Sequence, residues 1–174
     1  ILLVPISADW MRAVTDKEFI EVFSHTIFSS FVATATAIVF GFIFAYGVNY
    51  TNMPCKRFFQ VVALLPTMAP SVVSGLAFIM LFGRRGFITW EMLHLKVDLY
   101  GPVGLWVAQT IAFFPLAYIT ISGVLKNISP NLELAAQNLG AKGWYLFRTV
   151  TLRLATPGLA SAFLLVGINS LADF

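Results

Sequence analysis

Residues 24–48 read SHTIFSSFVATATAIVFGFIFAYGV, and this stretch decides the class of fold. It contains no Asp, Glu, Lys or Arg, and it is longer than the roughly 20 residues that a helix needs to cross the hydrocarbon core of a bilayer. Small and hydroxyl-bearing residues recur along it, and such residues let helix backbones approach closely in lipid. We therefore expect a membrane-spanning helix packed inside a bundle.

The composition of the whole chain supports this interpretation. Of its 174 residues, 59% are hydrophobic and 11% are charged, and the mean hydropathy is +0.84. Soluble globular domains have far more charge and less apolar surface. We expect an all-α polytopic transmembrane bundle, of which this sequence is an excerpt with about four to five spans. The charge-free windows place the spans at about 24–48, 58–82, 102–125 and 157–174.

Three prolines fall inside the expected spans. Pro66 and Pro70 lie in the second span, and Pro115 lies in the third. Proline lacks the N–H of an ordinary residue and its ring clashes with the carbonyl four residues earlier. We expect a kinked or broken helix at Pro66 and Pro70 and an interruption at Pro115. All three prolines are candidate hinges, with static kinks as the alternative.

The basic residues are dispersed between the spans, so the sequence does not indicate a nucleic-acid partner. If residues 126–156 face the cytoplasm, alternation of the spans places 49–57 on the same side. That side would hold slightly more cations than the five on the other side, which agrees with the positive-inside rule. Its cations are Lys56, Arg57, Lys126, Lys142, Arg148 and Arg153.

Residues 132–158, LELAAQNLGAKGWYLFRTVTLRLATPG, combine charge with helical periodicity. Ser129 and Pro130 are typical of a helix start, and Gly140 suits the left-handed position that follows a helix end. A second amphipathic helix is predicted at about 142–154, because its apolar residues recur at helical spacing. Two short helices joined at a glycine turn would form a surface suited to docking at the membrane face.

The motif of this stretch resembles the cytoplasmic EAA loop of permease subunits of ATP-binding-cassette importers. The resemblance implies a MetI-like permease fold, with 126–156 as the loop whose first helix sits in a groove on the ATPase subunit. The chain departs from the motif at Leu134, where the motif has Glu, and at Arg153, where it has Pro. The residues that the resemblance assigns to ATPase coupling are Glu133, Ala135, Ala136, Leu139, Gly140 and Ala141.

The stretches FFPLAYIT at 113–120 and SLADF at 170–174 resemble the first half of fused permeases that serve ferric-iron-binding proteins. The resemblance implies a multi-pass protein of the bacterial inner membrane and three kinds of partner. These are a dimer of ATPase subunits, a periplasmic substrate-binding protein and a second permease half, fused or separate. ATP and Mg²⁺ would bind to the partner, and the chain itself would need no cofactor.

Other functions stay open at this point. Permeases for thiamine, phosphonate, polyamine and sulfate resemble the chain as well, and a transporter driven by an ion gradient is the alternative of another class. Asn169 and Asp173 are candidate pathway residues, because polar groups at membrane depth usually face a cavity; the alternative places Asp173 at the far interface. No metal site is predicted, since His25 and His94 are distant and have no ligand at metal-binding spacing. The absence of phosphate-loop, zinc-protease and serine-nucleophile motifs favours a transport subunit over an enzyme.

Overall fold

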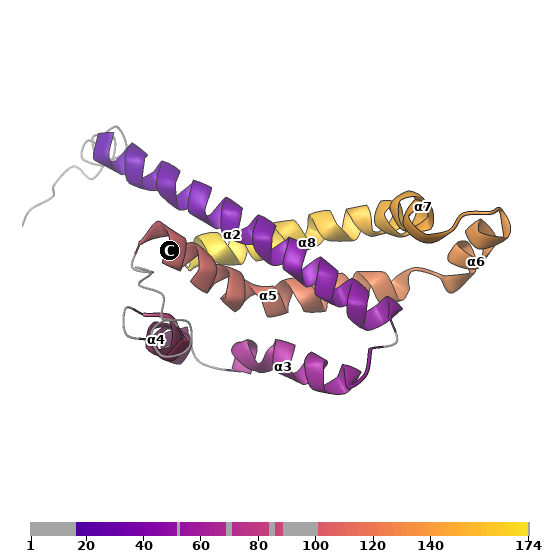
Figure 1. Ribbon diagram of the computed structural model, residues 1–174. Coiled ribbons are helices and arrows are strands. Elements are labelled where there is room, and N and C mark those ends of the chain that lie inside the picture. The colour runs from indigo at the N-terminus through magenta and orange to yellow at the C-terminus, as the bar shows by residue number, and fades with distance from the viewer. Residues whose placement is uncertain (1–16, 52, 69–70, 84–85, 89–100, 174) are drawn as a thin grey trace, which may run out of the picture.

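The computed structural model describes residues 17–51, 53–68, 71–83, 86–88 and 101–173, and the regular elements in these ranges are helical. Three long helices form a bundle in which α2 crosses the other two (Figure 1). They are α2 (Lys17–Tyr50), α5 (Pro102–Asn127) and α8 (Leu152–Ala172). The shorter helices α3 (Lys56–Met68) and α4 (Ser71–Phe82) contact the bundle through α5.

Helix α2 buries small residues and exposes large ones. Its large apolar side chains lie outside the bundle: Phe31 is 58% exposed, Phe40 56% and Ile43 61%. In a bilayer this arrangement sets the large side chains against lipid and lets the small face approach other helices. The expectation of a small-residue helix packed inside a bundle is confirmed. The buried face consists of Ser30, Ala33, Thr34, Ala37, Gly41, Ala45 and Val48.

Gly41 marks a close approach between α2 and α5. A Cβ added at Gly41 would lie 2.9 Å from the Cβ of Ala117 and 3.1 Å from the backbone N of Tyr118. Polar side chains tie the same two helices together at another level. The Trp106 indole N–H donates to Thr36 Oγ1 at 3.0 Å. Hydrogen bonds of this kind add to the packing that holds helices together in lipid.

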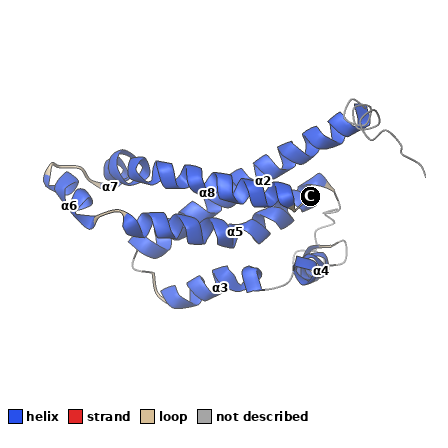
Figure 2. Cartoon of the chain, turned by 180° about the vertical axis from the view of Figure 1, so that it is seen from behind, coloured by secondary structure: helices blue, strands red, loops and turns tan. Residues whose placement is uncertain are grey.

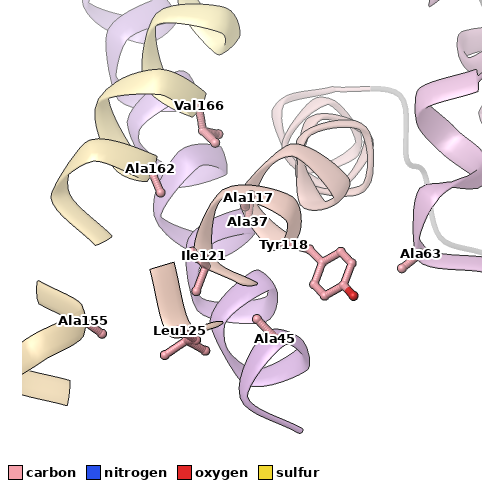
Figure 3. Close-up of a cluster of buried hydrophobic side chains, with 10 residues drawn as sticks. All are labelled: Ala37, Ala45, Ala63, Ala117, Tyr118, Ile121, Leu125, Ala155, Ala162 and Val166. Carbon is pink, nitrogen blue, oxygen red and sulfur yellow. The ribbon is translucent and has the colours of Figure 1, made fainter. Parts of the chain in front are cut away.

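The core lies where α2, α5 and α8 meet (Figure 3). Ala37 of α2, Ile121 of α5 and Val166 of α8 are all 0% exposed. Tyr118 points away from this centre toward Ala63 of α3 (Figure 3), so its ring joins α3 to the bundle. The core is therefore built from short side chains, with few large residues at its centre.

Three helical stretches of the described residues are long and apolar enough to cross a membrane, judged by length and composition: Lys17–Tyr50, Pro102–Asn127 and Gly143–Ala172. The segment 58–82, expected as a kinked or broken span, consists of two separate helices, α3 and α4. Neither piece reaches the roughly 20 residues of a crossing helix. Pro66 lies inside α3, and the break expected from the prolines follows it, while Pro70 lies outside the described residues.

Two corrections concern Pro115 and Pro157, each of which lies inside a continuous helix. Helix α5 runs without interruption through Pro115. The span expected to begin at Pro157 begins at Leu152 instead, and the expected separate helix at 142–154 joins it without a loop. It consists of α7 (Gly143–Leu146) and a π-helical turn, η2 (Phe147–Thr151). Neighbouring helices and small backbone adjustments re-satisfy the groups that a proline frees in such a bundle.

Candidate functional site

Helices α6 (Pro130–Asn138) and α7 with η2 form a hairpin at one end of the bundle (Figures 1 and 2). The connection from α2 to α3 lies at the same end, as the alternation of spans predicted. Aromatic rings join the hairpin to α2: the ring centroids of Tyr46 and Phe147 are 5.0 Å apart, and those of Trp144 and Phe147 are 5.1 Å apart. We call the segment 129–151 the α6–α7 hairpin.

The glycine turn of the hairpin has the predicted geometry. Gly140 has φ +90° and follows the last residues of α6. Its N–H donates to the carbonyl of Gln137 at 2.9 Å, and the N–H of Ala141 donates to the carbonyl of Ala136 at 3.0 Å. These two bonds form a Schellman motif, in which a left-handed residue satisfies the last carbonyls of a helix. The role expected for Gly140 in ending α6 is confirmed.

The outer surface of the hairpin is apolar and uncovered in this chain. Leu139 is 90% exposed, Trp144 72% and Tyr145 66%. Cationic side chains surround these residues, since Lys142 and Arg148 are exposed as well. An exposed apolar surface beside polar groups is typical of a site that binds another protein.

The residues predicted for ATPase coupling do not share one face. Ala135, Leu139 and Gly140 are exposed, and Ala136 is half-buried. Ala141 is only 8% exposed. The exposed residues could touch a partner directly, whereas Ala141 supports the turn from inside. The coupling role of all these residues stays a prediction.

Glu133 faces inward. Thr151 Oγ1 donates to Glu133 Oε1 at 2.8 Å, and the Tyr50 side chain interacts electrostatically with the same carboxylate. Thr151 is 2% exposed. Sequence reasoning missed both partners, because Tyr50 lies on another helix and Thr151 lies inside the predicted second amphipathic helix. In the sequence, these contacts were indicated only by the polarity of Tyr50 and Thr151 next to apolar stretches.

The candidate pathway residues lie near the C-terminal end of α8, away from the hairpin. Asn169 and Asp173 are both exposed, one helical turn apart. The side-chain amide of Asn169 donates to the carbonyl of Leu165 at 2.8 Å, and the backbone N–H of Asp173 donates to the carbonyl of Asn169 at 3.1 Å. Both side chains therefore face away from the bundle core, and their pathway role stays a prediction.

The candidate hinges have different surroundings. Pro115 is buried inside α5. Pro66 lines a crevice of about 640 Å³ between α3 and the bundle, together with Phe44, Phe59 and Trp106. Space beside Pro66 is compatible with movement of α3, whereas Pro115 is packed on all sides. The hinge roles themselves stay predictions.

Fold and site together define a polytopic helical membrane protein that carries an exposed amphipathic hairpin at one end. Residues 37–174 match the family model described as binding-protein-dependent transport system inner membrane component. The chain belongs to this family. The resemblance to importer permeases that the hairpin motif indicated is confirmed.

Individual relatives differ in the transported substance that their names give. The chain is 33% identical over 173 residues to a ferric transport system permease protein of Haemophilus influenzae, covering 94% of this chain and 27% of the relative. It is 34% identical over 173 residues to the ferric transport system permease protein of Actinobacillus pleuropneumoniae, covering 94% of this chain and 25% of that relative. A molybdenum transport system permease protein of Escherichia coli is 33% identical over 165 residues, covering 92% of this chain and 70% of the relative. The chain thus spans about a quarter of the ferric relatives.

Proposed function

We propose that this chain is part of the membrane-spanning permease of an ATP-driven importer, and that α6 is the helix that a partner ATPase subunit holds. Family membership supports the permease role. The observation that carries the coupling role is the α6–α7 hairpin, whose Leu139 is 90% exposed beside a Schellman turn. Trp144 and Tyr145 are exposed on the same hairpin, and aromatic side chains of these two types are enriched among the residues that anchor protein–protein contacts.

The connections of the hairpin suit transmission of movement. Only Ile128 and Ser129 separate α5 from α6, as the two capping residues. At the other side η2 continues directly into α8. When ATP binding closes the partner subunits, their grooves would displace α6, and α5 and α8 would follow. A ligand shifts such an equilibrium by its different affinity for the two states, here an inward-open and an outward-open permease.

The charges at the hairpin end support a cytoplasmic position. The exposed cations there include Arg57, Lys126, Lys142, Arg148 and Arg153. Cytoplasmic loops of membrane proteins carry an excess of Lys and Arg. The hairpin would thus face ATPase subunits in the cytoplasm of a bacterium, with the chain in the inner membrane. ATP and Mg²⁺ would be held by those subunits.

The opposite end of the bundle would receive substrate from a binding protein on the periplasmic side. A second permease half, fused or separate, would complete the pathway. We propose ferric iron as the substrate, because two of the most similar relatives are ferric transport permeases. Sulfate and molybdate are the competing substrates, since permeases named for sulfate and molybdenum transport are also similar. Thiamine, phosphonate and polyamine are further alternatives within the same class.

A pull-down of the full-length protein in mild detergent, followed by ATP turnover in liposomes, tests the proposal. We expect an ATPase to copurify and its turnover to rise with an iron-loaded binding protein. Sulfate-loaded and molybdate-loaded binding proteins are the matched controls. Stimulation by one of these controls, and not by the iron-loaded protein, would overturn the substrate. Transport without any copurifying ATPase would overturn the importer and favour a carrier driven by an ion gradient.

A further inference from the structure

Glu133 makes two contacts that lead to different parts of the bundle. Thr151, which donates to its carboxylate at 2.8 Å, is the last residue of η2, directly before α8. Tyr50, whose side chain interacts electrostatically with the same carboxylate, is the last residue of α2. A single carboxylate on α6 therefore bridges the adjoining ends of α2 and α8.

The contact between Glu133 and α2 joins two helices that are not consecutive in the chain. Helix α6 is joined covalently to α5 on one side and to α7, η2 and α8 on the other. Helix α2 reaches the hairpin only through side chains. The Tyr46 ring stacks on Tyr50 with centroids 4.9 Å apart and meets Phe147 at 5.0 Å. Glu133 adds an electrostatic interaction with Tyr46 and Tyr50 to these ring contacts.

The orientation of Glu133 argues against a direct contact with a partner. The neighbouring Leu134 is 55% exposed and Leu139 is 90% exposed, so these apolar side chains are more accessible to a partner than the half-buried Glu133. Glu133 is half-buried, and its Oε1 is already occupied by a hydroxyl donor that is itself buried. Hydrogen bonds to an ionised carboxylate are roughly twice as strong as neutral ones, so the contact favours one position of α6.

We propose that Glu133 is a positioning residue that ties α6 to the ends of α2 and α8, so that a displacement of α6 moves both helices together. The proposal rests on the proposed function, in which an ATPase displaces α6. Without the tie, α6 pivots about its connections to α5 and α7 and leaves α2 behind. ATP hydrolysis would then continue while less substrate is moved in each cycle.

The test uses the full-length permease with its ATPase in liposomes and an iron-loaded binding protein. Glu133→Gln removes the charge, and Tyr50→Phe removes the Tyr50 hydroxyl. Thr151→Val removes the hydrogen-bond donor to Glu133 and keeps the shape of the side chain. Glu18→Gln is the matched control, because Glu18 is exposed in the first turn of α2, away from the hairpin. The measured quantities are ATPase copurification and the amount of substrate moved per ATP.

We expect all variants to retain the ATPase in normal yield. Substrate moved per ATP should fall about fivefold in Glu133→Gln, the lower end of the usual range for coupling between sites. Thr151→Val should show a similar fall, and the double variant should fall no further than Glu133→Gln alone. Such non-additivity is expected when two residues act through one contact.

Two results would overturn the tie while leaving the importer intact. One is a normal ratio of substrate to ATP in Glu133→Gln. The other is loss of the ATPase in Glu133→Gln alone, with normal yield in Thr151→Val, which would make Glu133 a partner contact. Failure of the unaltered protein to retain an ATPase would instead refute the proposed function. If Glu133→Gln does not insert, Thr151→Val decides the question, since it leaves the carboxylate in place.

Discussion

Replacement of Gly41 by alanine tests the packing of α2 against α5. The new Cβ would lie 2.9 Å from the Ala117 Cβ and 3.1 Å from the Tyr118 backbone N, whereas carbon atoms in favourable contact are about 3.5–4.0 Å apart. Helix backbone cannot yield as a flexible side chain does, and overpacking of this kind typically costs about 1–3 kcal/mol. Alanine returns about 1 kcal/mol as the better helix former. We expect a net loss of about 1 kcal/mol in the free energy of unfolding.

Gly123→Ala is the matched control for this prediction. Gly123 lies on α5, is exposed, and has nothing within 4 Å of an added Cβ. The substitution should therefore stabilise the helix by up to about 1 kcal/mol. Thermal unfolding in detergent, followed by tryptophan fluorescence, should show a lower midpoint for Gly41→Ala and an unchanged or higher one for Gly123→Ala. Equal midpoints in the two variants would refute the close approach of α2 and α5.

Three further predictions concern the hairpin and the polar contacts of the bundle. Gly140→Ala adds no clash but forces a residue with a side chain to adopt φ +90°, which costs roughly 1–2 kcal/mol. Copurification of the ATPase should therefore fall. Gly140→Asn should retain more of the ATPase, because Asn tolerates this conformation. Asn49→Ala removes the hydrogen bond from its side-chain amide to Ser122 Oγ at 2.9 Å, and the free energy of unfolding should fall by about 0.6–1.7 kcal/mol. Adding Ser122→Ala should not double this loss, and a series of melting points checks both expectations. Trp106→Phe removes the donor to Thr36 and should lower the unfolding midpoint less than Thr36→Ala, which also removes the 2.8 Å contact between Thr36 Oγ1 and Thr110 Oγ1. A double variant that loses more than Thr36→Ala alone would show that the two residues act separately.

The membrane class and the all-α transmembrane bundle could be predicted because they follow from local composition. The charge-free window at 24–48 required a membrane helix, and its small residues indicated the face that packs. The turn at Gly140 was equally predictable, because the left-handed conformation is a property of a single residue. Features of this kind depend on residues that are neighbours in the sequence.

The prolines show where local reasoning fails. Pro66 and Pro115 carry the same chemistry, but α5 continues through Pro115 while the 58–82 segment divides after Pro66. Pro115 is buried among neighbouring helices that hold α5 in place, whereas Pro66 lines an open crevice. The difference lies in tertiary packing, which the sequence around each proline does not contain.

The inward orientation of Glu133 could not be predicted for a related reason. The motif assigned this residue to a partner surface, but its contacts with Tyr50 and Thr151 depend on how α2 and η2 meet at the end of the bundle. Those helices are far apart in the sequence. A carboxylate that meets residues of two other helices is a three-dimensional arrangement, and helical periodicity alone does not reveal it.

The buried face of α8 differs from that of α5 in how it is held. Within the described part of the chain, the side-chain hydrogen bonds of α8 run to its own backbone, from Thr156, Ser161 and Asn169. Its buried positions are Ala155, Ala162, Val166 and Ser170, and Gly158 leaves room for the Val124 side chain of α5. Side-chain hydrogen bonds connect α5 to α2, whereas α8 is held in the bundle by the packing of its side chains. Among the described residues, the polar contact that sets the position of α8 therefore lies at its N-terminal end, where Thr151 donates to Glu133, and a movement of α6 would reach the packed part of α8 through that end.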